Sequence, residues 1–371
     1  MKICILTQPL GHNYGGIMQN YALQKVLKKM GHEVWTEDRR PNKETLLIKI
    51  KKIPFVRFLF GKKKIEKTLT PSIAEKDIIE RNTRKFIKDN IQTTIPIYSS
   101  NKKELLKYNF DAYIVGSDQV WRPRYSYGLY NYFLDFTKGL HVKRIAYAAS
   151  FGVDNWEFTD EQTKKCKKFS KQFDIVSVRE DSGIELCKSH LGIDAIHVLD
   201  PTLLLEKEDY VKLIESKRES NSGLYTYILD ESQEKNKIIK IISSKLNLIK
   251  STVMPELKFQ TLGNNPLTKC SLAYVSDWLS GFYNADFIFT DSFHGTIFSI
   301  IFNKQFITIA NKDRGIARFS SLLKLFGLEN RLIFSINELT DTLITNRINY
   351  DLVNKNKEKM QKISMDFLKQ I

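Results

Sequence analysis

The sequence predicts an α/β protein with two Rossmann-like domains that face each other across a cleft. Two observations support this prediction. Residues 3–36 read as a strand, a glycine-rich turn, a helix and a second strand, which is a βαβ unit. Short apolar strands separated by helices then recur in two series of similar size, one before and one after Pro201.

The first βαβ unit is the clearest local pattern. Residues 3–7 form an apolar run of strand length, and residues 11–16 form a turn that contains three glycines. Apolar side chains from Ile17 to Met30 then keep helical spacing, and Gly31 ends the helix. Residues 33–36 read as the second strand, so we expect the two strands to be parallel.

The rest of the first series repeats this arrangement. Four more apolar strands are expected, at residues 111–115, 144–149, 175–178 and 195–199. Each ends in small or polar residues, and residues 179–182 supply capping chemistry for a helix over 183–188. Ligands bind at this carboxyl edge of a parallel sheet.

The second series follows Pro201 and predicts the domain organisation. We expect strands at residues 224–229, 285–290 and 306–310, and helices at 237–246, 275–283, 294–302 and 350–371. The predicted units are an N-terminal domain over 1–190 with an insertion at about 41–70, a C-terminal domain over 191–345, and a C-terminal helix over 346–371.

The net charge of the chain is +16, from 58 Lys and Arg against 42 Asp and Glu among 371 residues. Such an excess first indicates a polyanion binder. However, residues 49–67 carry eight basic side chains and one acidic one, so this segment alone holds +7. Because phenylalanines lie among these lysines, the segment is either an interfacial membrane contact or a solvated loop. No nucleic-acid motif is found, and no nucleic-acid partner is expected.

Several classes of protein are disfavoured. No run approaches the roughly 18 apolar residues of a membrane span, and the N-terminus lacks a signal-peptide pattern. The four cysteines are widely separated, so we expect a reduced, cytoplasmic protein with buried thiols. The His–Glu–x–x–His and Gly–x–Ser–x–Gly patterns do not occur, and we expect neither a metal nor a cofactor.

Two segments at helix starts are candidate ligand sites. The turn with Asn13, Tyr14, Gly15 and Gly16 has the position of a phosphate loop, although it matches no dinucleotide or P-loop pattern. Its alternative is a tight turn without a ligand. The second segment centres on His294, a proton donor or acceptor near neutral pH. At the same helix start, Ser292, Gly295 and Thr296 are candidates for binding an anionic donor substrate. The alternative is a capping segment with a structural histidine.

Cations and an aromatic residue at strand ends complete the candidates. Arg179, Arg314 and Arg318 follow predicted strands, where arginine grips carboxylate or phosphate. The alternative for each is a surface ion pair. Ser117, Asp118 and Trp121 follow another strand, and polar groups beside an aromatic ring suit a sugar. The alternative there is a capped turn with a buried tryptophan.

Six of these segments, in this order, resemble the polysaccharide pyruvyl transferase family. The matching segments are residues 13–24 (NYGGIMQNYALQ), 115–121 (VGSDQVW), 146–152 (AYAASFG), 177–182 (SVREDS), 198–202 (VLDPT) and 290–295 (TDSFHG). The resemblance extends from the first strand to about residue 330. The Gly15–Gly16 pair departs from those members that have an acidic residue after the glycine.

The resemblance implies a fold like that of GT-B glycosyltransferases. It also implies transfer of pyruvate from phosphoenolpyruvate to two hydroxyls of a sugar, with release of phosphate, during assembly of a cell-surface polysaccharide. By position, His294 is the expected acid/base residue, and Arg179 and Arg314 are expected near the donor. The acceptor is a saccharide, either free or lipid-linked, and a lipid-linked acceptor would place the protein at the inner membrane face.

Two other functions stay open at this point. A GT-B glycosyltransferase that uses a nucleotide sugar has the same expected fold. A non-catalytic polyanion binder is the reading that the net charge alone favours.

Overall fold

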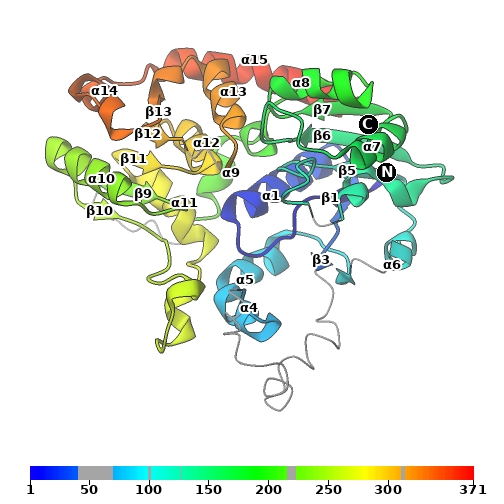
Figure 1. Ribbon diagram of the computed structural model, residues 1–371, viewed down its shortest axis with the longest axis horizontal. Coiled ribbons are helices and arrows are strands. Elements are labelled where there is room, and N and C mark those ends of the chain that lie inside the picture. The colour runs from blue at the N-terminus through cyan, green and yellow to red at the C-terminus, as the bar shows by residue number, and fades with distance from the viewer. Residues whose placement is uncertain (41–69, 99–101, 127, 215–222, 311–313) are drawn as a thin grey trace.

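The computed structural model describes residues 1–40, 70–98, 102–126, 128–214, 223–310 and 314–371. Figure 1 shows two lobes, one built around strands β9 to β13 and the other around β1 and β5 to β7. The predicted basic insertion, with residues 49–67, lies outside the described residues.

The N-terminal lobe contains a parallel sheet of six strands within the described residues, in the order β2-β1-β5-β6-β7-β8. Its strands are β1 (Lys2–Leu6), β2 (Glu33–Thr36), β5 (Ala112–Val115), β6 (Lys143–Ala149), β7 (Ile175–Val178) and β8 (Ile196–His197). A short parallel pair, β3 (Arg39–Arg40) and β4 (Ile97–Tyr98), lies beside it.

Some helices of this lobe begin at side chains that cap them. The main ones are α1 (Tyr14–Lys29), α4 (Ile73–Ile79), α5 (Arg81–Asn90), α6 (Lys102–Leu106), α7 (Asp160–Ser170) and α8 (Ser182–Leu186). Helices α4 and α7 each start with a capping box, formed by Ser72 with Glu75 and by Thr159 with Gln162.

The C-terminal lobe holds a second parallel sheet, with five described strands in the order β10-β9-β11-β12-β13. These are β9 (Leu224–Tyr227), β10 (Lys250–Ser251), β11 (Phe287–Thr290), β12 (Gln305–Ile309) and β13 (Leu332–Ile333). Its helices are α10 (Gln233–Leu246), α11 (Val275–Asn284), α12 (Phe293–Ile301), α13 (Ala317–Phe326) and α14 (Asp341–Thr345), and α9 (Lys207–Val211) lies between the lobes in sequence.

The strand order reverses once in each sheet. In the N-terminal sheet the chain runs from β1 to β2 on one side and returns to β5 on the other, so the order reverses between β1 and β5. The same reversal occurs between β9 and β11 in the second sheet. Ligands of doubly wound α/β folds bind outside the carboxyl ends of strands at such points. Ser117 follows β5 and His294 follows β11, so both predicted segments lie at these points.

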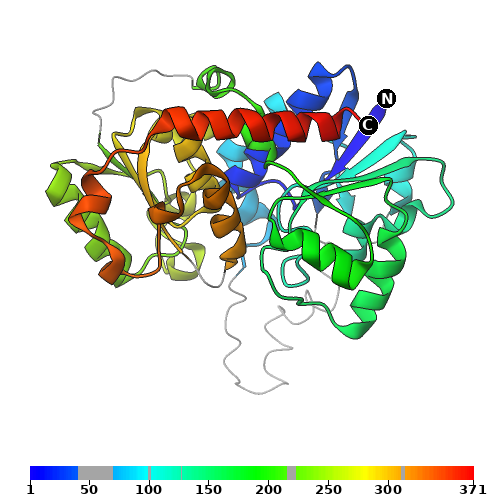
Figure 2. The same ribbon diagram turned by 90° about the horizontal axis from the view of Figure 1, so that it is seen from above.

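One hydrophobic cluster runs through both lobes. It joins α1 residues such as Tyr14 and Met18 to α11 and α12 residues such as Trp278 and Phe298. The C-terminal helix α15 (Tyr350–Leu368) strengthens this junction, because it crosses from the second lobe to the first (Figure 2). Its Ser364 hydroxyl accepts a hydrogen bond from the Leu199 amide at 2.9 Å.

Several expectations need adjustment. Helix α1 starts at Tyr14, so Gly15 and Gly16 lie in its first turn rather than in a loop. Strand β8 pairs with β7 in the first sheet, so residues 191–197 belong with the N-terminal lobe and the change of sheet falls between 197 and 224. The fold class, two Rossmann-like units, is confirmed.

The four cysteines are buried and unpaired, as expected from their spacing. None of the described helices combines the length and apolar character that a membrane crossing requires.

Candidate active site

Arg179 is the first residue after β7 and lies almost completely buried between the lobes. Its Nη1 donates to Asp200 Oδ2 at 2.8 Å, and its Nη2 lies 3.6 Å from Asp118 Oδ1. Burial alone would lower the pKa of Arg179, but the charges of Asp200, Asp118 and Glu180 outweigh it and raise the pKa. The Nε and Nη2 atoms have no hydrogen-bond partner among the described residues. Arg179 is therefore a permanent cation with unused donors.

Asp200 is a fully buried carboxylate at the centre of a polar cluster. The other members of this cluster are Ser117, Asp118, Arg179, His294 and Arg318. The Oδ1 atom of Asp200 accepts from the Thr202 amide at 3.0 Å and from the Thr202 hydroxyl at 2.7 Å. Its Oδ2 takes the Arg179 bond and lies 3.6 Å from His294 Nε2, and the Ser117 hydroxyl donates to it at 3.4 Å. Burial would raise the pKa of Asp200, but the neighbouring His294 and the charge of Arg179 lower it below its usual value. Asp200 is thus an anion at neutral pH.

His294 occupies the first turn of α12, which Ser292 caps by accepting from the Gly295 amide at 3.3 Å. The side chain is 6% exposed, and its Nε2 has no hydrogen-bond partner among the described residues. The amides of Phe293 and His294 are among the first N–H groups of the helix, which lack intrahelical acceptors. The helix start therefore offers donors and positive partial charge beside the histidine.

Gly15 brings α1 of the first lobe against this histidine. A Cβ built on Gly15 would lie 2.1 Å from His294 Nδ1 and 2.2 Å from its Cγ. Only a residue without a side chain permits this approach. The glycine of one motif and the histidine of another are therefore a packed pair across the two lobes.

Tyr14 has a structural position. It is 2% exposed, its ring stacks on Trp278 with centroids 5.4 Å apart, and its hydroxyl donates to the Ala273 carbonyl at 2.8 Å. The expectation that Tyr14 meets a substrate is therefore wrong, because the side chain joins α1 to the C-terminal lobe. Asn13 is half-buried, and its side chain makes no capping bond to α1.

Arg318 is a second buried cation near Arg179. The Arg179 guanidinium carbon lies 4.5 Å from the centroid of the Phe293 ring, and that of Arg318 lies 5.0 Å from it. Arg318 Nη2 donates to the Arg314 carbonyl at 2.6 Å, and its Nε has no partner among the described residues. Burial and the charge of Arg179 lower the pKa of Arg318 to about 10. Two buried arginines that both approach the Phe293 ring, each with a free N–H group, can bind an anion.

Arg314 does not contribute its side chain to this cluster. It forms a two-bond ion pair with Asp230, at 2.5 Å and 3.0 Å, and both side chains are about 40% exposed. The prediction that Arg314 binds the donor as an unpaired cation therefore does not agree with its pairing to Asp230. Its carbonyl oxygen positions Arg318 instead.

The loop after β6 is excluded as an anion site by Glu180. Glu180 Oε1 accepts from the amides of Phe151 and Gly152, at 2.6 Å and 2.9 Å, and from the Ser150 hydroxyl at 3.1 Å. An internal carboxylate thus already fills the position that a phosphate would take. The available donors in this region are those of Arg179, Arg318 and the α12 start.

The remaining predicted residues divide between the cluster and the core. Ser117 and Asp118 belong to the cluster, and Asp118 has a left-handed φ of 74°. Trp121 does not, because it has no exposed surface, stacks on Phe133 and donates to the Tyr132 carbonyl at 2.8 Å. The prediction that Trp121 stacks on a sugar is wrong.

The helix-start residues also differ in role. Ser292 is the cap, and a Cβ on Gly295 would lie 2.3 Å from Thr290 Oγ1, so Gly295 packs on β11. Thr296 is fully buried and shares a hydrogen bond with the Thr308 hydroxyl at 2.8 Å. Thr296 therefore faces the sheet, and the expectation that it binds the donor is wrong.

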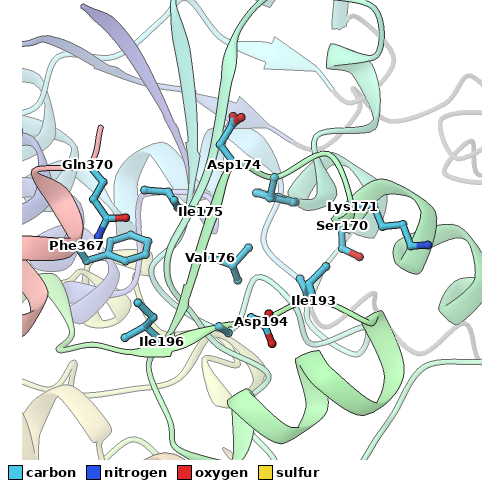
Figure 3. A pocket seen from close by; sticks show the side chains of 12 residues that line it. Ser170, Lys171, Asp174, Ile175, Val176, Ile193, Asp194, Ile196, Phe367 and Gln370 are labelled. Carbon is cyan, nitrogen blue, oxygen red and sulfur yellow. The ribbon is translucent and has the colours of Figure 1, made fainter.

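A cavity of about 370 Å³ lies elsewhere, at the opposite edge of the N-terminal sheet (Figure 3). Its walls include Asp174, Ile175 and Val176 at the amino end of β7, together with Phe367 near the end of α15. Arg179 follows the carboxyl end of the same strand, so this cavity is separate from the cluster.

Asp200 and Phe293 are the residues that sequence reasoning did not select. Asp200 stood in the segment 198–202, and its position directly after a predicted strand was the available signal. Phe293 gave no such signal, because a phenylalanine in a helix start reads as a core residue.

Two facing Rossmann-like lobes with a charged site at their switch points define a GT-B-fold enzyme. Solved structures support this fold. UDP-N-acetylglucosamine 2-epimerase from Rickettsia bellii is 12% identical with a TM-score of 0.51, and covers 100% of this chain and 95% of its own. UGT89C1 from Arabidopsis thaliana, complexed with UDP-L-rhamnose, is 10% identical with a TM-score of 0.54, and covers 100% and 97%.

The chain belongs to the polysaccharide pyruvyl transferase family. The family model "Polysaccharide pyruvyl transferase" matches residues 13–313, which is most of the chain. No curated protein matches the chain in sequence. The protein is therefore a transferase, and the matched region includes Gly15, Arg179, Asp200 and His294.

Proposed function

We propose that this protein transfers the pyruvyl group of phosphoenolpyruvate to two hydroxyls of a sugar unit in a cell-surface polysaccharide, and releases phosphate. Family membership supports pyruvyl transfer to a saccharide. The observation that supports the donor is the pair of buried arginines, Arg179 and Arg318, whose free N–H groups lie beside the helix that carries His294.

The donor fits the charge of this site. Phosphoenolpyruvate carries a carboxylate and a phosphate, and arginine binds both groups through paired N–H donors. The first amides of α12 add a third set of donors next to His294. A helix start and two arginines can thus hold both anionic groups without a metal ion.

The reaction requires proton transfers that a histidine can perform. A proton adds to the methylene carbon of the donor, and positive charge develops at the neighbouring carbon. One sugar hydroxyl forms a bond to that carbon and loses its proton, and the second hydroxyl does the same as the bond to phosphate oxygen breaks. The products are a cyclic ketal and phosphate. His294 is the group that we assign to the proton on the methylene carbon.

The acceptor is expected on the N-terminal side of the site. The side chains there that remain suited to hydroxyl groups are those of Asn13, Ser117 and Asp118. Because phosphoenolpyruvate is a cytoplasmic metabolite, we place the reaction in the cytoplasm, with a free or lipid-linked saccharide as acceptor.

Phosphate release from phosphoenolpyruvate tests the proposal. The purified protein is assayed with lipid-linked and nucleotide-linked sugar acceptors, beside His294→Ala and a control, His141→Ala, whose histidine is exposed. We expect release by the wild type and by the control, and a loss of at least about 100-fold in His294→Ala. If His294→Ala matches the wild type, or no acceptor supports release, the proposal fails.

Thermal shift separates this function from a nucleotide-sugar glycosyltransferase. A ligand at 100 times its dissociation constant stabilises its protein by about 2.7 kcal/mol. We expect phosphoenolpyruvate to raise the melting temperature and uridine diphosphate to leave it unchanged. The opposite pattern would favour the glycosyltransferase.

A further inference from the structure

We infer that Asp200 is a positioning residue of this site. Its one buried carboxylate holds His294 of the C-terminal lobe and Arg179 of the N-terminal lobe in register. This inference rests on the proposed function, since it assigns His294 the proton transfer. It adds a residue that acts through others and does not itself touch the substrate.

The carboxylate is held in one orientation. Both Thr202 bonds go to Oδ1, so the group cannot rotate without losing them. The other oxygen is then directed at Arg179 Nη1 and His294 Nε2, at 2.8 Å and 3.6 Å. A single oxygen therefore lies beside a basic side chain from each lobe.

The backbone that carries Asp200 is also held. The Tyr147 hydroxyl donates to the Leu199 carbonyl at 3.0 Å, and the Leu199 amide donates to Ser364 of α15. Pro201 follows directly and starts a short 3-10 helix. These contacts fix the position of Asp200 before any substrate binds.

The surroundings of His294 leave Asp200 as its neighbouring acid. Asp200 is the carboxylate within 4 Å of the ring among the described residues. Asp118 pairs with Arg179 instead, and the Gly15 backbone of α1 covers the Nδ1 side of the ring. The orientation of the imidazole therefore depends on the packing of Gly15 on one side and on Asp200 on the other.

The test compares Asp200→Asn with Glu37→Gln. Glu37 is also a fully buried carboxylate paired with an arginine, Arg39, but it follows β2 and has no contact with His294 in the described residues. Replacing either acid removes one buried charge and costs stability. Only Asp200→Asn should change the chemistry.

We expect Asp200→Asn to lower kcat by about 100-fold, because supporting partners of catalytic groups have effects of this order. Glu37→Gln should keep kcat within about threefold of the wild type, because it lies away from His294. A kcat of Asp200→Asn within about threefold of that of Glu37→Gln would overturn the inference.

Two further measurements keep the inference falsifiable. If Asp200→Asn does not fold, Thr202→Val keeps the charge and the amide bond to Oδ1 but removes the hydroxyl bond, and we expect kcat to fall several-fold because the carboxylate is held less firmly. An unchanged kcat would count against a positioning role. Histidine ¹³C NMR, with the His294 signal assigned through His294→Ala, needs no substrate. The chemical shift of the His294 signal should change in Asp200→Asn even if phosphoenolpyruvate is not the donor, because the ring loses its neighbouring carboxylate. An unchanged signal would overturn the inference independently of the proposed function.

Discussion

Replacing Gly15 with alanine tests the contact between the two lobes most directly. The added methyl carbon would lie 2.1 Å from His294 Nδ1 and 2.7 Å from its Cβ. Ordinary contact begins at 3.4 Å, so the methyl group overlaps the ring by about 1.3 Å, which is 3.4 minus 2.1. Either the imidazole or α1 must move by a similar distance, and either movement changes the position of His294 relative to the N-terminal lobe.

The magnitude follows from the size of this shift. A misplacement of about 1 Å in a catalytic group costs on the order of 100-fold in rate, or about 2.7 kcal/mol in the activation barrier. Alanine is also a better helix former than glycine by up to about 1 kcal/mol, which offsets part of the packing cost. We therefore expect a folded protein that has lost most of its activity.

The assay is phosphate release, run beside circular dichroism and thermal unfolding, with Gly16→Ala as the matched control. A Cβ on Gly16 would lie 3.3 Å from Asn13 Nδ2, so a shift of a few tenths of an ångström accommodates it. Gly16→Ala should keep kcat within about threefold of the wild type. If Gly15→Ala retains the same activity as Gly16→Ala, the argument that Gly15 places His294 is wrong.

Three other changes test the remaining assignments. Arg318→Gln should raise KM for phosphoenolpyruvate about tenfold. It should also raise the free energy of unfolding by about 1 kcal/mol, because burial lowers the pKa of Arg318 and its Nε has no hydrogen-bond partner among the described residues. A lower stability in urea would contradict this. Trp121→Phe loses the hydrogen bond to the Tyr132 carbonyl, so the free energy of unfolding should fall by about 1 kcal/mol. A KM for the acceptor more than threefold higher would instead support stacking of Trp121 on a sugar. The pKa of Asp200 is lower in the folded than in the unfolded chain. The stability that its charge adds to the folded protein is therefore complete above the ordinary pKa of 3.8, and is lost as pH falls through the lower folded pKa. Melting temperatures below pH 4 should fall more steeply for the wild type than for Asp200→Asn.

The fold was predictable because its signals are local. Apolar runs that end in polar residues mark parallel strands, and every described pairing in both large sheets is parallel. The same logic brought Arg179, Ser117 and His294 together, since the carboxyl ends of parallel strands converge. Helix and strand ends differed by a few residues, as for α10, which starts at Gln233 instead of residue 237.

The errors concern the direction of side chains. Tyr14 and Trp121 stand in motifs beside polar residues, and nothing in the sequence shows that both rings turn into apolar clusters. Arg314 and Arg318 are four residues apart, and only the fold shows that Asp230 neutralises the first and not the second. Burial and pairing are tertiary properties, so composition and spacing cannot predict them.

The net charge of +16 is therefore a poor guide to this site. The described cluster uses two arginines whose effect depends on burial, because a cation inside the protein interacts with an anion through a lower effective dielectric than one at the surface. Asp200 accepts from Arg179 of the N-terminal lobe and lies beside His294 of the C-terminal lobe, so a separation of the two lobes would break one of these two contacts. Each lobe alone has only part of the constellation, which explains why the motifs that carry it are spread from residue 15 to residue 318.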